Sequence, residues 1–198
     1  MVSAAESHWI DQAQQGDDPS FTYLVETYQK PVYNLCYRML GNMEEAEDAA
    51  QETFLRAYKA IRHYDPARSF LTWLLSIASH YCIDLIRRRH FQFISLEDYP
   101  GEVIQDENPG PEVMAWRHED QQQIQGLLQS LSPTDRAAIV LYYWYDYSYV
   151  EIASTLVLST SAVKSRLHRA RRQLAHNWQE QKGQALPKER TPYGSLVF

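Results

Sequence analysis

Hydrophobic residues recur along most of the chain at steps of three and four, which is the period of an α-helix with one packed face. The clearest of these stripes run through residues 21–40, 46–61, 70–86, 114–128, 138–143, 150–156 and 163–174, with Ser132-Pro133 predicted to start a new helix between the fourth and the fifth. A shorter stripe around Trp9 predicts a first helix within residues 1–17. Only seven glycines occur in 198 residues, so the periodic pattern is rarely interrupted. The pattern predicts an all-α protein.

Turn-forming residues predict where the second of these helices begins and ends. Asp18 followed by Pro19 is typical of a helix start, with the aspartate as N-cap and the proline at the first helical position. Pro31 removes a backbone donor and should kink or restart the helix. Gly41-Asn42 predicts its C-cap and the following turn.

The segment from Leu158 to Leu174 predicts a basic helix with Ser159 as its N-cap. It carries five Lys/Arg and no acid between positions 164 and 172, opposite an apolar stripe. A short apolar helix over 149–156 precedes it, and a three-residue turn joins the two. This order is typical of a helix-turn-helix, whose second helix enters the DNA major groove. Taken alone, the segment could equally be a surface helix with a solvated basic face.

The distribution of charge along the chain is more informative about a nucleic-acid partner than the net charge of −6. Residues 1–60 hold ten acids against four Lys/Arg. The bases gather instead at 87–89 and 164–172. Two basic sites on an acidic body indicate a specific contact with nucleic acid, because the acidic remainder would oppose loose binding.

A second candidate DNA contact lies in the long helix predicted over 70–89. Its wide apolar band implies deep packing, and a separate polar stripe begins at Trp73 and ends at Arg87. An aromatic ring and basic groups beside the turn-rich loop 62–69 could meet an unstacked DNA strand. The alternatives are that Trp73 is a core residue and that Arg87-Arg88-Arg89 is a cationic helix end that favours the helix dipole.

The remaining sequence features concern the linker, the C-terminal tail and the cellular location of the protein. Residues 91–112 are acidic and rich in proline and glycine, which predicts a flexible linker. The tail after Gln181 is expected to be extended, although its apolar end could dock on the protein. Cys36 and Cys82 share no metal-binding spacing and are interpreted as reduced core residues. Because no apolar run is long enough to span a membrane and no signal peptide is recognised, a cytoplasmic protein is expected.

Four motifs in order resemble the extracytoplasmic-function (ECF, group 4) sigma factors of the bacterial sigma-70 family. They cover roughly residues 18–178 and read AEDAAQETFLRAY at 46–58, FLTWLLSIASHYCIDLIRRR at 70–89, LQSLSPTDRAAIVL at 128–141, and SYVEIA with TSAVKSRLHRARRQL between 148 and 174. Their combination is far more specific than a helix-turn-helix alone.

The resemblance implies two small helical domains joined by a flexible acidic linker. Sigma region 2 would occupy 1–90, the linker 91–112, sigma region 4 would occupy 113–178, and 179–198 would be a tail. Region 2 would bind core RNA polymerase and open the promoter −10 element, and region 4 would read the −35 element. The family is often held by an anti-sigma factor, commonly at the membrane. No cofactor, metal, small-molecule substrate or enzymatic activity is implied.

The resemblance also implies three sets of site residues. The −35 element would be read by Lys164, Ser165, His168 and Arg169, with phosphate contacts from Arg166, Arg171 and Arg172. The −10 element would be met by His63, Tyr64, Arg68, Trp73, His80, Arg87 and Arg88. Core polymerase would dock on Asp48, Gln51, Glu52 and Arg56.

The chain departs from the family pattern at three places. Ser161-Ala162 replaces the usual Gly-Thr, His80 replaces a frequent Asn, and the turn Tyr145-Asp146 lacks the common glycine. Two other functions fit the sequence less well. A free-standing helix-turn-helix regulator would leave 43–89 unexplained, and no metal-ligand, nucleophile-base or phosphate-loop motif supports an enzyme.

Overall fold

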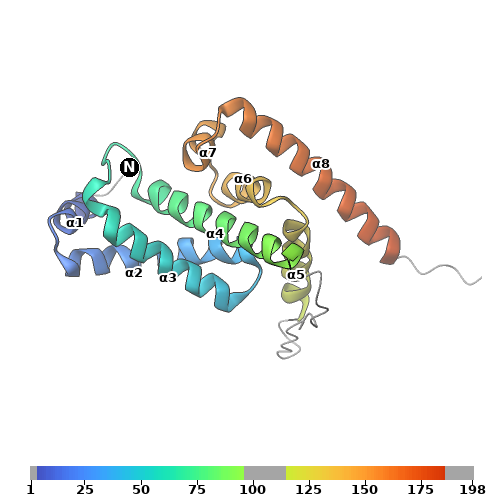
Figure 1. Ribbon diagram of the computed structural model, residues 1–198, viewed down its shortest axis with the longest axis horizontal. Coiled ribbons are helices and arrows are strands. Elements are labelled where there is room, and N and C mark those ends of the chain that lie inside the picture. The colour runs from blue at the N-terminus through green and yellow to red at the C-terminus, as the bar shows by residue number, and fades with distance from the viewer. Residues whose placement is uncertain (1–3, 96–114, 186–198) are drawn as a thin grey trace, which may run out of the picture.

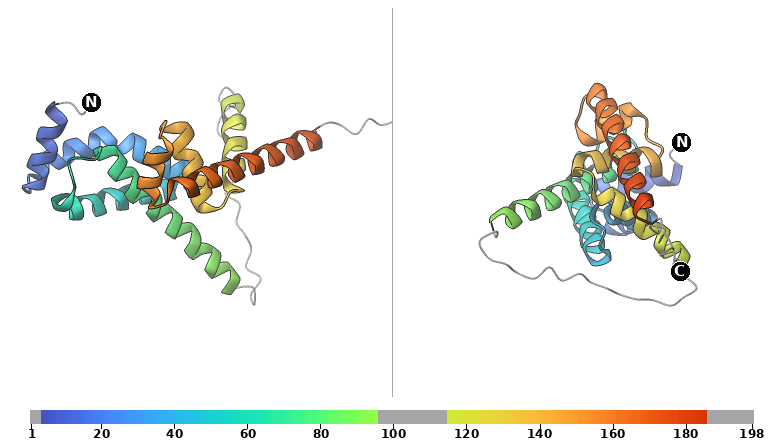
Figure 2. Two further views of the ribbon diagram at one scale, coloured as in Figure 1. Left: turned by 90° about the horizontal axis from the view of Figure 1, so that it is seen from above. Right: turned by 90° about the vertical axis from the view of Figure 1, so that its right-hand side faces the viewer.

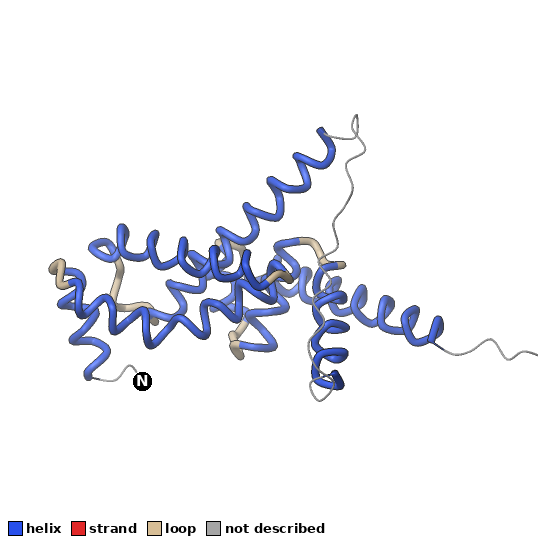
Figure 3. The backbone as a smooth tube through the Cα atoms, turned by 90° about the horizontal axis from the view of Figure 1, so that it is seen from below, coloured by secondary structure: helices blue, strands red, loops and turns tan. Residues whose placement is uncertain are grey.

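The computed structural model describes residues 4–95 and 115–185, and all regular elements in these ranges are helices, as predicted (Figure 3). In order they are α1 (Ala4–Gln14), α2 (Asp18–Leu40), α3 (Met43–Ala60), the 3-10 turn η1 (Ile61–His63), α4 (Phe70–Ser95), α5 (Ala115–Gln129), α6 (Pro133–Trp144), α7 (Tyr149–Leu156) and α8 (Thr160–Ala185).

The ends of α2 follow the predicted chemistry with two corrections. The N-cap is Asp17 rather than Asp18, because the Asp17 carboxylate accepts from the Ser20 N–H at 2.9 Å. Of the kink or restart predicted at Pro31, the restart does not occur, since α2 runs through this residue. Pro31 costs the helix a backbone hydrogen bond, but the buried residues that follow it hold both halves in one helix. Gly41 ends α2 in the left-handed conformation at φ 83°, as the sequence predicts.

The first domain packs α2 against α3 and α4, with α1 across the end of α2 (Figure 1). α4 is buried along much of its length, which agrees with its wide apolar band. Leu74, Leu75, Ala78 and Cys82 are all fully buried on it. The two cysteines, Cys36 and Cys82, are far apart in sequence, and both are buried and free.

The second domain is built from α5 to α8, with α7 and α8 as the helix-turn-helix. Ser148 and Glu151 form a capping box that starts α7. Val157 turns the chain between α7 and α8 at φ 54°, a left-handed conformation that strains a β-branched residue. Asp146, in the turn after α6, also adopts a positive φ of 53°.

The two domains pack directly against each other. α4 contacts α6 and α7, and α2 contacts α5 and α6, whereas α8 projects away from the body (Figures 1 and 2). α4 continues to Ser95, five residues beyond the predicted end of the first domain, since no proline or glycine interrupts it there. The rest of the predicted linker and positions 186–198 of the tail lie outside the described residues.

Candidate nucleic-acid interface

The basic face of α8 is exposed because its apolar stripe anchors the opposite side. Val163, Leu167 and Ala170 are buried against α6 and α7. The Ser159 hydroxyl accepts from the Ala162 N–H at 3.2 Å, which satisfies a free donor of the first turn. The four residues predicted to read bases are exposed together: Lys164, Ser165, His168 and Arg169.

The three arginines predicted to contact phosphate have different surroundings. Arg166 is partly buried and pairs with the Asp135 carboxylate at 2.8 Å. The Arg171 guanidinium lies over the Tyr142 ring, 4.9 Å from its centre, and its Nε donates to the Tyr143 hydroxyl. Arg172 is exposed. Phosphate contacts by Arg166 and Arg171 would therefore compete with bonds that hold α8 on α6, whereas Arg172 faces solvent.

The loop before α4 is shaped by Tyr64. This side chain is buried, its ring packs edge-on against Phe70, and its hydroxyl donates to the Arg68 carbonyl. Burial is the main reason that its pKa is raised to about 12. The geometry thus favours a structural role for Tyr64 over the predicted DNA contact. His63 and Arg68 are exposed on the same loop.

Trp73 and His80 are half-buried on α4. The Trp73 ring packs against Tyr64 with 5.0 Å between ring centres, so it is partly a core residue, as one interpretation of the sequence expected. His80 Nδ1 lies 2.8 Å from the Ser76 carbonyl, so one of the two ring nitrogens is engaged with the backbone of α4. Arg87 and Arg88 are exposed further along α4.

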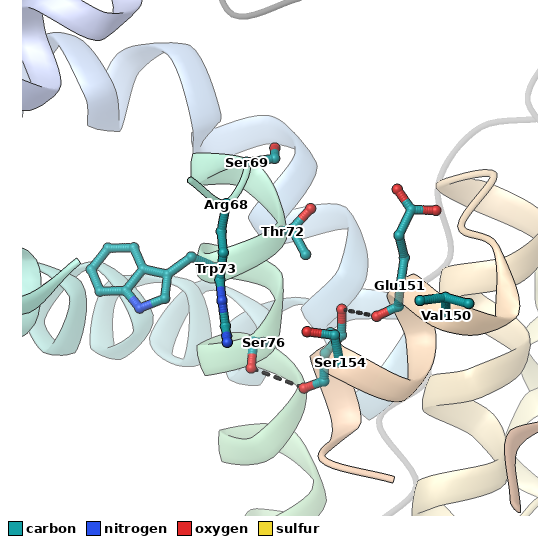
Figure 4. A pocket seen from close by; sticks show the side chains of 9 residues that line it. Arg68, Ser69, Thr72, Trp73, Ser76, Val150, Glu151 and Ser154 are labelled. Carbon is teal, nitrogen blue, oxygen red and sulfur yellow. Dashed lines mark hydrogen bonds between the residues drawn. The ribbon is translucent and has the colours of Figure 1, made fainter. Parts of the chain in front are cut away.

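A pocket of about 240 Å³ separates this side of α4 from α7 (Figure 4). The Ser76 hydroxyl donates across it to the Thr155 carbonyl at 2.9 Å. Its walls combine the loop, α4 and α7: Arg68, Ser69, Thr72, Trp73, Ser76, Val150, Glu151, Ser154 and Thr155. Two candidate DNA-binding residues, Arg68 and Trp73, are therefore brought together beside the helix-turn-helix.

The residues predicted to dock polymerase share the exposed side of α3. Asp48 and Gln51 are exposed, and Arg56 pairs with Glu52 at 2.7 Å while its guanidinium lies over Tyr81. A groove of about 460 Å³ between α2 and α3 reaches this side and is lined by Val25, Gln29, Tyr33, Glu47, Ala50, Gln51 and Phe54. Sequence reasoning missed the α2 half of this groove, because its residues belong to a different helix.

Sequence reasoning also missed the polar residues that join the two domains, chiefly Gln125, Arg136 and Tyr145. Each donates to a backbone carbonyl of α2. Such bonds leave no periodic signal in the sequence. Within 4–95 and 115–185, no group of three or more potential ligands is placed to hold a metal ion. No helix in those ranges is long and apolar enough to cross a bilayer.

Comparisons with known proteins match both domains. The family model for Sigma-70 region 2 matches residues 24–91, and that for Sigma-70 region 4 matches residues 121–174. The ECF RNA polymerase sigma factor SigW of Bacillus subtilis is 37% identical over 173 residues, which cover 83% of this chain and 92% of SigW. SigE of Mycolicibacterium smegmatis is 39% identical over 79% of this chain and 60% of its own length.

Solved structures extend the likeness to the arrangement of helices. The chain matches CnrH in complex with the cytosolic domain of CnrY with 25% identity and a TM-score of 0.66, over 89% of this chain and 99% of that one. It matches the fold of the sigma factor RpoE, in complex with the anti-sigma factor NepR from Bartonella quintana, with 21% identity, a TM-score of 0.63, and coverage of 80% and 96%.

A helix-turn-helix domain matched by sigma region 4, packed on a domain matched by sigma region 2, defines a protein of the sigma-70 family. The chain belongs to the ECF RNA polymerase sigma factors.

Proposed function

We propose that this sigma factor binds core RNA polymerase through the exposed side of α3, reads the −35 element with α8, and opens the −10 element with α4 and its preceding loop. The proposal depends on the exposed α8 side chains Lys164, Ser165, His168 and Arg169, which face outward because the apolar stripe on the opposite side of the helix is buried. Phosphate contacts would position α8, and base contacts would specify the site.

The proposal extends to the regulation of the protein. Two structurally similar chains are described in complexes, one with the cytosolic domain of CnrY and one with the anti-sigma factor NepR. We infer that an anti-sigma factor also binds this chain. The protein would then act in the cytoplasm, and an inhibitor with a membrane anchor would hold it at the membrane.

Run-off transcription tests the proposed function. The purified chain is added to sigma-free core polymerase from the source bacterium, with genomic promoter fragments as template. We expect defined transcripts that require the chain and whose start sites reveal the two promoter elements. Retained DNA binding without transcripts and without co-elution with core would instead support the free-standing regulator.

A further inference from the structure

An apolar groove lies in the second domain, between α5, α6 and α8. Its volume is about 340 Å³, near the lower end of the range for ligand pockets. Three of its side chains are both large and exposed: Ile124 at 43%, Tyr143 at 54% and Trp144 at 38%. The whole lining is apolar or aromatic and consists of Ile124, Leu127, Leu128, Ile139, Tyr143, Trp144 and Leu174. A contiguous apolar surface of this kind is typical of a binding site.

Polar side chains beside the groove are bonded within the second domain. The Arg171 Nε donates to the Tyr143 hydroxyl at 3.0 Å. The Gln173 side-chain amide donates to the Ser130 carbonyl, and that of Asn177 donates to the Ser130 hydroxyl, both at 2.8 Å. These bonds fix α8 beside the end of α5. The groove is thus held open by the fold and favours an apolar occupant.

The C-terminal tail is long enough to return to this groove. Ala185, at the end of α8, follows the groove residue Leu174 by eleven residues, which is about 16 Å along the helix. Another eleven residues separate Ala185 from Leu196, and a chain of that length spans at most about 40 Å. The connection therefore covers the return distance more than twice over.

The tail also carries an apolar run that suits the groove. Leu196-Val197-Phe198 follows a segment that contains Lys188, Glu189 and Arg190 together with two prolines and a glycine. Burial of the apolar run removes its side chains from water, whereas the charged segment gains nothing in an apolar groove. Because the tail belongs to the same chain, its effective concentration at the groove is on the order of millimolar. A contact that is weak between separate molecules is then sufficient.

We propose that Leu196-Val197-Phe198 binds in the groove between α5, α6 and α8 and covers it. This inference goes beyond the proposed function and does not depend on it. A second protein that binds in this groove must first displace the tail. Its apparent affinity then falls by the fraction of molecules in which the groove is open. The tail thereby regulates access to this surface of the second domain.

The test places a nitroxide spin label on the tail and observes the groove by methyl NMR of the full chain. The native cysteines, Cys36 and Cys82, are fully buried, so Ser195→Cys provides one accessible thiol for the label. We expect the label to broaden the methyl signals of Ile124 and Leu127. The methyl signals of α1, at the opposite end of the molecule, should not change (Figure 1).

A pair of matched variants then assigns the contact to the apolar run. Val197→Asp places a charge within the run, and Thr191→Asp adds the same charge six residues earlier in the tail. Val197→Asp should restore the lost signals of Ile124 and Leu127, whereas Thr191→Asp should leave them broadened. Ile124→Asp, at an exposed position of the groove, should restore the Leu127 signal from the other side of the contact.

Three results would overturn the inference. Absence of broadening in the labelled wild-type background would show that the tail does not occupy the groove. Equal recovery in both tail variants would assign the effect to charge instead of the apolar run. Broadening of an unlabelled chain by a spin label on another copy would assign the groove to a second molecule.

The proposed function is tested separately by run-off transcription with the wild-type chain. Normal transcripts without broadening of the groove signals would refute the tail contact alone. Broadening that Val197→Asp removes, without any transcripts, would support the tail contact and count against the proposed function.

Discussion

α8 and α4 both carry cations and polar residues on an amphipathic helix, but they present them differently. On α8, the side chains of Lys164, Ser165, His168 and Arg169 face solvent. On α4, Ser76 is bonded to α7 and His80 is bonded to its own backbone. The comparison shows that a polar stripe is available to bind DNA only where its side chains are not already bonded to another part of the protein.

The width of the apolar band explains the difference. α8 buries a narrow stripe against one side of the molecule, so its other side stays open. α4 buries residues toward α2 and α3 and also contacts α6 and α7. A helix that packs on two sides has little surface left, and its polar side chains must then bond within the protein.

The largest expected effect tests whether the buried stripe sets the position of α8. Leu167 is fully buried, and Leu167→Ala should lower the free energy of unfolding by about 2–5 kcal/mol. Urea denaturation followed by circular dichroism measures it. The matched control is Leu174→Ala, at a half-buried position on the same stripe, which should cost less. Equal losses would contradict the view that α8 is anchored mainly at Leu167.

The next effect separates base contacts from phosphate contacts on α8. Arg169→Ala should relax the preference between −35 sequences by roughly 1–3 kcal/mol, the worth of one good base contact. Arg172→Ala should weaken all promoters alike and reduce the slope of log affinity against log salt by about 1. Fluorescence anisotropy across a set of −35 duplexes measures both. An unchanged promoter ranking in Arg169→Ala would refute this assignment.

A smaller effect concerns α7, the helix that faces α4. Ser148→Ala removes the N-cap hydroxyl and should cost about 1 kcal/mol of stability at neutral pH. Hydrogen bonds from the Ser148 hydroxyl and backbone N–H lower the pKa of Glu151. A lowered carboxyl pKa stabilises the fold above the unfolded-state value, and this contribution is lost as pH falls through the folded-state value.

Ser148→Ala should therefore lose less stability than the wild type when the pH is lowered through the acid range. Thermal unfolding at a series of pH values checks this, with Ser154→Ala, an exposed serine on the same helix, as the control. Parallel pH profiles for wild type and Ser148→Ala would show that the capping box does not govern the titration of Glu151.

The smallest expected effect concerns Arg166, which pairs with Asp135 and is also proposed to contact a DNA phosphate. Its ion pair with Asp135 is partly exposed, with 29% and 16% of the two side chains accessible, so the coupling should be at most about 1 kcal/mol. A double-mutant cycle with Arg166→Ala and Asp135→Asn measures it. If Arg166 also contacts phosphate, Arg166→Ala should weaken DNA binding and Asp135→Asn should not. Equal losses of binding would assign Arg166 to the fold alone.

Local signals in the sequence predicted much of the fold and part of the candidate site. The cap at Ser159 and the left-handed end at Gly41 depend on neighbours within a few residues, so they could be recognised from the chain. The exposed row on α8 followed from a single helical period. At Pro31 the helix does not restart, because the buried residues on both sides of it belong to one packed helix.

Other features depend on partners that are remote in sequence. Tyr64 is buried by Phe70 and Trp73, and Arg171 is placed over Tyr142 by the crossing of α6 and α8. No periodic pattern distinguishes an arginine that will meet an aromatic ring from one that will meet solvent. Only the family resemblance connects such side chains with DNA.

The sequence by itself determined the helices, the helix-turn-helix and the family, because helical periodicity, capping chemistry and motif order are local properties. Only the tertiary structure decided which polar surfaces remain free. The cap that Gln125 places on α2 and the bond from Ser76 to α7 join residues more than seventy positions apart. These contacts exist only once the two domains have packed, since each group satisfies a partner that its own helix cannot supply.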